Sequence, residues 1–101
     1  MAVDRQLLHI ISTIRDLDDL ERFFRDLFTP AELDDISLRW KLLKDLYQGI
    51  PQRKIAQKYG ISLCKITRGS RVLKKKDAMV PHLMKQMADE PPPDSVDKKN
   101  P

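Results

Sequence analysis

The sequence predicts an all-α protein, and three observations lead to this prediction. Apolar residues recur every three or four positions through most of the chain, which is the spacing of amphipathic helices. Only three glycines occur, and no run of alternating β-branched residues indicates a strand. With 101 residues, the chain is expected to form one domain with a small core, which we place at residues 1–89.

Two amphipathic helices are expected in the N-terminal third of the chain. The first covers residues 3–15, where apolar side chains recur at helical spacing. The second begins at Leu17, and the acidic residues in its first turn complement the helix dipole. Its apolar stripe includes all three phenylalanines and is wide for a short helix, so it needs a large surface to pack against.

A capping box predicts where a long third helix begins. In Thr29-Pro30-Ala31-Glu32, threonine takes the N-cap, proline the first helical position and glutamate the third. We expect this helix to run to about Gln48 and to end at Gly49.

The C-terminal part should contain one more helix and a tail. The helix is expected at about residues 78–88, with Pro81 tolerated only in its first turn. Residues 90–101 are rich in proline and charge, so we expect a disordered tail there.

Residues 51–74 have the pattern of a helix-turn-helix. Gly60 follows the first helix at a position that commonly needs positive φ, and Ser62 is expected to cap the second helix with its hydroxyl. In such a motif the second helix enters the DNA major groove. The side chains expected to face inward are Ile55, Ala56, Tyr59, Leu63, Ile66, Ser70 and Leu73.

The charge of this segment agrees with nucleic-acid binding. Residues 52–76 contain nine lysines and arginines and no acid, whereas residues 1–35 carry nine acids and four bases. This separation places a DNA-facing surface at one end of the molecule. We expect DNA contacts from Gln52, Arg53, Lys54, Cys64, Lys65, Thr67, Arg68, Arg71 and Lys74.

Other kinds of function have little support in the sequence. The single cysteine, Cys64, rules out an internal disulfide and suits a reducing cytoplasm. We find no 18-residue apolar run and no signal peptide, so we expect a soluble cytoplasmic protein without a membrane partner. The two histidines and Cys64 lack metal-ligand spacing, and no nucleophile–base pair or phosphate loop is visible. We therefore expect no metal, no cofactor and no catalytic site.

The apolar faces of the helices exceed what one short chain can cover. A homodimer in which the N-terminal helices of two chains interlock would cover them. Such a dimer also places two recognition helices one turn of DNA apart, which matches a palindromic operator in double-stranded DNA. The alternative is a monomer with an exposed apolar patch.

Taken together, several of these segments resemble the tryptophan repressor family. They are Leu-Phe-Thr-Pro-Ala-Glu at 27–32, Leu-Arg-Trp at 38–40, Gly49, Gln-Arg-Lys-Ile-Ala at 52–56 and, most specific of all, Ile-Thr-Arg-Gly-Ser at 66–70. The resemblance covers roughly residues 20–87. It implies an intertwined homodimer of about six helices that binds operator DNA when L-tryptophan, the corepressor, occupies two symmetric pockets.

The same resemblance implies a set of ligand-binding residues. Arg39 and Arg68 match two arginines that sandwich the indole, and Arg68 can also pair with the carboxylate. Thr29 matches a threonine that helps to hold the carboxylate from the other subunit. Gly69 matches a glycine that leaves room for the ring. Val72 stands where the family often has a serine that helps to bind the ammonium, so that group would rely on backbone carbonyls alone.

Each of these residues also has a simpler interpretation. Thr29 is an N-cap with or without a ligand, Arg39 has Asp35 as a possible ion-pair partner, and Arg68 can contact phosphate alone. We therefore interpret the chain as a sequence-specific repressor controlled by L-tryptophan, with two alternatives. One is a related regulator with another effector or none, which Val72 favours, and the other is a structural DNA-binding module.

Overall fold

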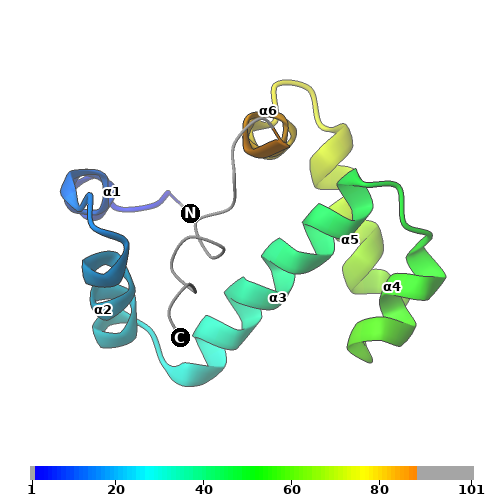
Figure 1. Ribbon diagram of the computed structural model, residues 1–101, viewed down its shortest axis with the longest axis horizontal. Helices are drawn as coiled ribbons and strands as arrows, with labels where there is room; N and C mark the ends of the chain where they lie inside the picture. Colours follow the sequence, from blue (N-terminus) through cyan, green and yellow to red (C-terminus); the bar gives the residue numbers. More distant parts are fainter. Residues whose placement is uncertain (1, 89–101) are drawn as a thin grey trace. The chain divides into compact units, whose positions relative to one another are not determined.

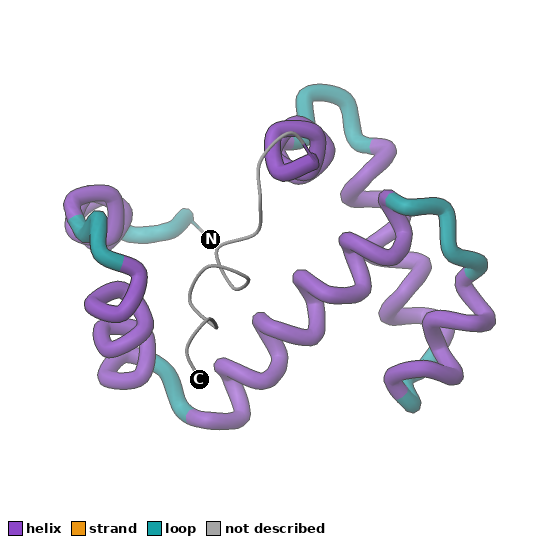
Figure 2. Tube along the Cα trace, in the orientation of Figure 1, coloured by secondary structure: helices purple, strands orange, loops and turns teal. Residues whose placement is uncertain are grey.

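The computed structural model describes residues 2–88 and contains six helices in that range (Figure 1). The all-α fold is thereby confirmed, and the described part shows helices and loops alone (Figure 2). The predicted tail, residues 90–101, lies outside the described residues. The helices are α1 (Arg5–Thr13), α2 (Leu17–Leu27), α3 (Pro30–Tyr47), α4 (Gln52–Tyr59), α5 (Leu63–Lys74) and α6 (Met79–Ala88).

Within residues 2–88 the chain divides into two compact units between Ser37 and Leu38, and α3 begins in the first unit and ends in the second. In the first unit, carboxylates cap both early helices. Asp4 accepts a hydrogen bond from the backbone N–H of Leu7, and Asp16 accepts one from that of Asp19. The first helix is therefore shorter than the predicted range 3–15, because Asp4 starts it and extended backbone follows at Ile14.

Neither α1 nor α2 contains a buried residue, although both are amphipathic. Phe24 and Phe28 pack edge to face with ring centroids 5.3 Å apart, yet both remain partly exposed. The wide apolar stripe that the sequence predicts for α2 is thus present, and none of its residues is buried within the described part of the chain.

The capping box at the start of α3 is confirmed in both directions. The hydroxyl of Thr29 accepts a hydrogen bond from the backbone N–H of Glu32 at 3.1 Å. In return, a carboxylate oxygen of Glu32 accepts one from the backbone N–H of Thr29 at 2.9 Å. Two N–H groups that the first turn leaves without helical partners are satisfied in this way.

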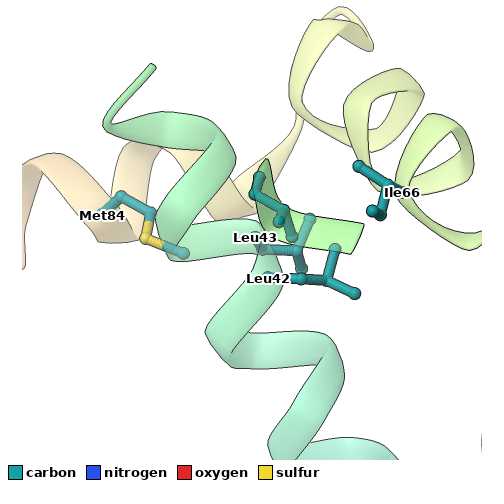
Figure 3. Packing of buried hydrophobic residues seen from close by; sticks show 5 residues of the cluster. Leu42, Leu43, Ile66 and Met84 are labelled. Atoms are coloured by element: carbon teal, nitrogen blue, oxygen red, sulfur yellow. The ribbon is translucent and has the colours of Figure 1, made fainter. Parts of the chain in front are cut away.

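The core of the second unit contains residues from four helices (Figure 3). Figure 3 shows Leu43 between Met84 on one side and Ile66 on the other. Ile55 and Ile66 have no exposed surface at all. Each such side chain contributes about 1.5–3 kcal/mol through burial, so this cluster holds the C-terminal half of α3 against the helices that follow it. The five core residues are Leu42, Leu43, Ile55, Ile66 and Met84.

Gly69 lies where α5 crosses α3. A Cβ atom built at this position would lie 2.8 Å from Cδ1 of Leu42, 3.2 Å from Cδ1 of Leu46 and 3.4 Å from Cδ2 of Leu43. The absence of a side chain therefore permits this close approach.

Two details of the predicted helix-turn-helix need correction. Ser62 takes the N-cap position of α5, but its side chain makes no capping hydrogen bond. Leu63 is 46% exposed instead of facing inward, although Ile66, three residues later on the same helix, is fully buried.

The turn after α5 contains an unusual backbone conformation. Asp77 has φ +63° and is the one non-glycine residue with positive φ in the described range. The α6 helix follows, and Pro81 is its third residue, within the first turn as expected. On α6 only Met84 is buried, whereas Met79, Leu83 and Met87 are exposed.

Candidate nucleic-acid interface

The second unit contains two short helices joined by a tight turn. Gly60 ends α4 in the left-handed conformation (φ +64°, ψ +39°), and the N–H of Ile61 donates to the carbonyl of Ala56 at 3.2 Å. Ile55 and Ile66 then place α4 and α5 against the same core. We call this segment, residues 51–74, the reading head.

The surface of the reading head and of the two residues that follow it is strongly basic. All nine lysines and arginines between residues 52 and 76 are exposed. Within residues 2–88, one of these nine cations forms an ion pair: Lys58, with Asp45. The fold thus keeps the cations in solvent and buries Ile55 of α4 and Ile66 of α5, which is an arrangement that suits phosphate binding.

The uncharged residues predicted to contact DNA lie at the beginnings of the two helices. Gln52 is the first residue of α4, and the hydroxyl of Thr67 on α5 donates to its side-chain oxygen at 3.4 Å. With its oxygen engaged in this way, the Gln52 amide keeps its N–H donors for another acceptor. Cys64, Lys65 and Thr67 are exposed in the first half of α5.

A buried acid behind the reading head was missed by sequence reasoning. Asp45 is 8% exposed in the last turn of α3. Its Oδ2 accepts hydrogen bonds from the Tyr59 hydroxyl at 2.7 Å and from the Lys58 ammonium at 3.1 Å. We call these three residues the Asp45 cluster. The sequence indicated the burial of Asp45 only by its place among the apolar residues 42, 43 and 46. The helical spacing did not indicate which residues would donate hydrogen bonds to it.

The Asp45 cluster shifts two pKa values in the same direction. The hydrogen bond to Asp45 is the main cause that raises the pKa of Lys58. Burial is the main cause that raises the pKa of Tyr59, and its hydrogen bond to Asp45 adds to the effect. Both groups are therefore held in their protonated forms, ammonium and neutral phenol.

The predicted ligand residues of the second unit lie on α3 and α5, the two helices that approach each other at Gly69. Arg39 lies three residues before Leu42, so it shares the side of α3 that meets Gly69. Arg68 precedes Gly69 and is exposed, as is Arg39. Val72 follows Gly69 by three residues and packs against the core.

The structure bears on the simpler roles of Arg39 and Thr29, and it gives Gly69 a packing role. Within residues 2–88, Arg39 forms no ion pair with Asp35 or with another acid. Gly69 has a packing role at the helix crossing, whether or not it also leaves room for a ligand ring. Thr29 lies in the first unit, where its hydroxyl caps α3.

Fold and surface together define the class: an all-α protein with a helix-turn-helix of the DNA-binding type. Comparison with known families agrees and is more specific. The chain matches the family described as Trp repressor protein over residues 4–88. It therefore belongs to the Trp repressor family, which is regulatory rather than enzymatic.

Curated relatives carry the same name. A Trp operon repressor homolog of Chlamydia caviae is 33% identical over 81 residues, which cover 79% of this chain and 80% of the relative. One of Vibrio parahaemolyticus is 34% identical over 73 residues, with 71% of each chain covered. One of Chlamydia trachomatis serovar L2 is 42% identical over 62 residues, covering 56% of this chain and 66% of the relative's own length. No solved structure matches the chain significantly.

The described residues contain neither a membrane-spanning helix nor a group of metal ligands. None of the helices in residues 2–88 has both the length and the apolar character needed to cross a membrane. Over the same range, no three histidine, cysteine or acidic side chains are grouped so that they could hold a metal ion.

Proposed function

We propose that the protein is a homodimeric transcriptional repressor that binds a palindromic operator in double-stranded DNA and takes L-tryptophan as its corepressor. The observation that carries the DNA-binding part is the exposure of nine cations, with no acid among them, on a helix-turn-helix. Membership of a family of repressors supports the regulatory part.

DNA binding would use the exposed sides of α4 and α5. The first half of α5, with Cys64, Lys65 and Thr67, would face base edges in the major groove, together with Arg68 and Arg71. Arg53 and Lys54 on α4, and Lys74 at the end of α5, would contact phosphates and set the register. Gln52 would donate from its amide while Thr67 holds its oxygen.

The dimer is supported by the apolar residues that stay exposed within residues 2–88. In the first unit, α1 and α2 bury no residue, yet each has a clear apolar face. Burial against a second chain would supply about 25 cal/mol for each Å² of apolar surface removed from water. The exposed apolar residues of this unit are Val3, Leu8, Ile10, Leu17, Leu27 and Ile36.

Control by L-tryptophan is supported by the chemistry of the residues at the α3–α5 crossing. Two exposed guanidinium groups, on Arg39 and Arg68, suit an aromatic ring that carries a carboxylate. In the proposed dimer Thr29 would come from the other chain; its hydroxyl accepts a hydrogen bond from the backbone N–H of Glu32 and keeps its own hydrogen for a further acceptor, such as the ligand carboxylate. A ligand that binds better to one arrangement of the reading heads would shift the population toward that arrangement.

Selection of operators from random duplexes, with and without L-tryptophan, tests the proposal. The expected product is a palindrome whose half-sites are one helical turn apart, enriched when L-tryptophan is present. Recovery of DNA without sequence preference would instead support the structural DNA-binding module. Equal enrichment with and without L-tryptophan, together with no heat on calorimetric titration, would support a regulator with another effector or none.

A further inference from the structure

The Asp45 cluster connects the end of α3 to the end of α4. Lys58 and Tyr59 are the last two residues of α4, and both donate to the same carboxylate oxygen of Asp45. The backbone reinforces this connection, because the N–H of Ile50 donates to the Asp45 carbonyl at 3.0 Å. One residue of α3 thus holds both the chain that leaves α3 and the far end of the next helix.

The position of Asp45 is unfavourable unless it is paired. Its carboxylate is almost buried, and burial without partners costs far more for a charge than for a neutral polar group. It also lies in the last turn of α3, where the helix dipole disfavours negative charge. The two donors of α4 offset both effects, so the contact depends on α4 being in this one orientation.

The Lys58 ammonium differs from the other cations of the reading head. It lies 3.1 Å from Asp45 and 5.1 Å from the centre of the Tyr59 ring. Lys54 lies one turn earlier on the same helix, is exposed, and forms no ion pair with any residue in the range 2–88. The two lysines therefore have the same charge and helix but different partners.

We propose that Asp45 is a positioning residue of the reading head, which fixes the end of α4 on α3 through Tyr59 and keeps Lys58 away from the DNA backbone. This inference rests on the proposed DNA binding. It divides the basic residues of α4 into two groups. Lys54 neutralises a phosphate, whereas Lys58 neutralises an internal acid and contributes no released counterion on binding.

The salt dependence of binding separates Lys58 from Lys54. Full-length wild-type protein, Lys58→Gln and Lys54→Gln are titrated with one selected duplex at several salt concentrations between about 50 and 200 mM. Lys54→Gln should reduce the slope of log K against log salt by about 1.8, because the proposed dimer would lose two phosphate contacts at about 0.9 each. Lys58→Gln should leave the slope as in the wild type. A slope reduced equally by both variants would overturn the inference.

Tyr59→Phe tests the positioning role without changing any charge. Loss of one hydrogen bond to a carboxylate should weaken operator binding about threefold or more, with an unchanged salt slope. The variant is compared at a temperature where circular dichroism shows that it is fully folded. If the folded variant binds the operator as tightly as the wild type, the Asp45 cluster only stabilises the fold, and the inference is overturned. If the wild type itself binds no duplex, the proposed function fails first, and this result is distinct from either variant outcome.

Discussion

A Cβ atom on Gly69 would lie 2.8 Å from Cδ1 of Leu42, closer than such atoms approach in folded proteins. Gly69 thus allows α5 to pack closely against α3. The residue before it is Arg68, the arginine proposed to bind both ligand and DNA. One of these two adjacent residues of α5 has a packing role, and the other has a proposed role in binding.

This contact predicts an effect of Gly69→Ala that changes sign with the residue at position 42. Alanine favours a helix by about 1 kcal/mol over glycine, but overpacking costs about 1–3 kcal/mol. We expect Gly69→Ala to lower the free energy of unfolding by about 1 kcal/mol. In a Leu42→Ala background, where the nearest methyl is removed, the same change should be neutral or stabilising. Urea denaturation of the four proteins measures the coupling, and additive effects would contradict it.

The Asp45 cluster predicts a specific loss of stability in alkali. The pKa values of Lys58 and Tyr59 are both raised in the folded state, so their contribution is complete below their ordinary values. It is lost as the pH rises beyond about 10, where these groups begin to lose their protons. Asp45→Asn should be less stable than the wild type at pH 8 and should lose less on going to higher pH. Urea midpoints across this range measure the difference, and parallel curves would show that the cluster is not its source.

The capping box predicts that the two proposed roles of Thr29 can be separated. Thr29→Ala should destabilise the protein by about 1 kcal/mol, because the N–H of Glu32 loses its acceptor. Thr29→Asp keeps a good N-cap but replaces the hydroxyl donor by a negative charge. We expect this variant to keep near-wild-type stability and to lose L-tryptophan affinity through repulsion of the ligand carboxylate. Unchanged affinity in a calorimetric titration would leave Thr29 with the cap alone.

The positive φ of Asp77 predicts a difference between two uncharged replacements. Asparagine tolerates the left-handed region, whereas alanine is strained there by about 1–2 kcal/mol. Since both replacements remove the charge beside the three lysines 74–76, their comparison isolates the backbone effect. Asp77→Ala should therefore unfold about 1 kcal/mol more easily than Asp77→Asn. Equal stabilities would show that the turn relaxes.

Val72 predicts how far the chain can be improved as a tryptophan sensor. A hydroxyl at this position would accept a hydrogen bond from the ligand ammonium, worth about 1.5–3 kcal/mol, or roughly tenfold or more in affinity. Val72→Ser should therefore bind L-tryptophan more tightly, at some cost in stability because Val72 packs against the core. Indole-3-propionate, which lacks the ammonium, serves as the control ligand. An equal gain for both ligands would show that the ammonium is not near residue 72.

The elements governed by local chemistry were predictable from the sequence. The capping box at Thr29, the left-handed Gly60 and the basic charge of residues 52–76 depend on neighbours a few positions away. Because such patterns depend only on nearby residues, they predicted the helices α3, α4 and α5 closely.

What was missed depends on contacts between distant segments. Asp45 has its partners 13 and 14 residues later, and its burial follows from the crossing of α3 by the helices after it. The close packing at Gly69 depends on where the leucines of α3 lie. Conversely, Leu63 fits the apolar period of α5, but no neighbour in the described chain covers it. Helical period predicts a face, and tertiary packing determines which part of that face is covered.

The uncovered faces of α1 and α2 have a consequence for the proposed dimer. Helices of 9 and 11 residues are marginal alone in water, so without a second chain they have little to hold them together. In the proposed dimer their folding would be a bimolecular event, and its equilibrium would depend on protein concentration. In a cell, the fraction of folded protein would therefore depend on how much of the protein is present. When synthesis slows, dilution would unfold the N-terminal helices and expose them to proteases. The amount of active protein would then fall more steeply than the amount of chain.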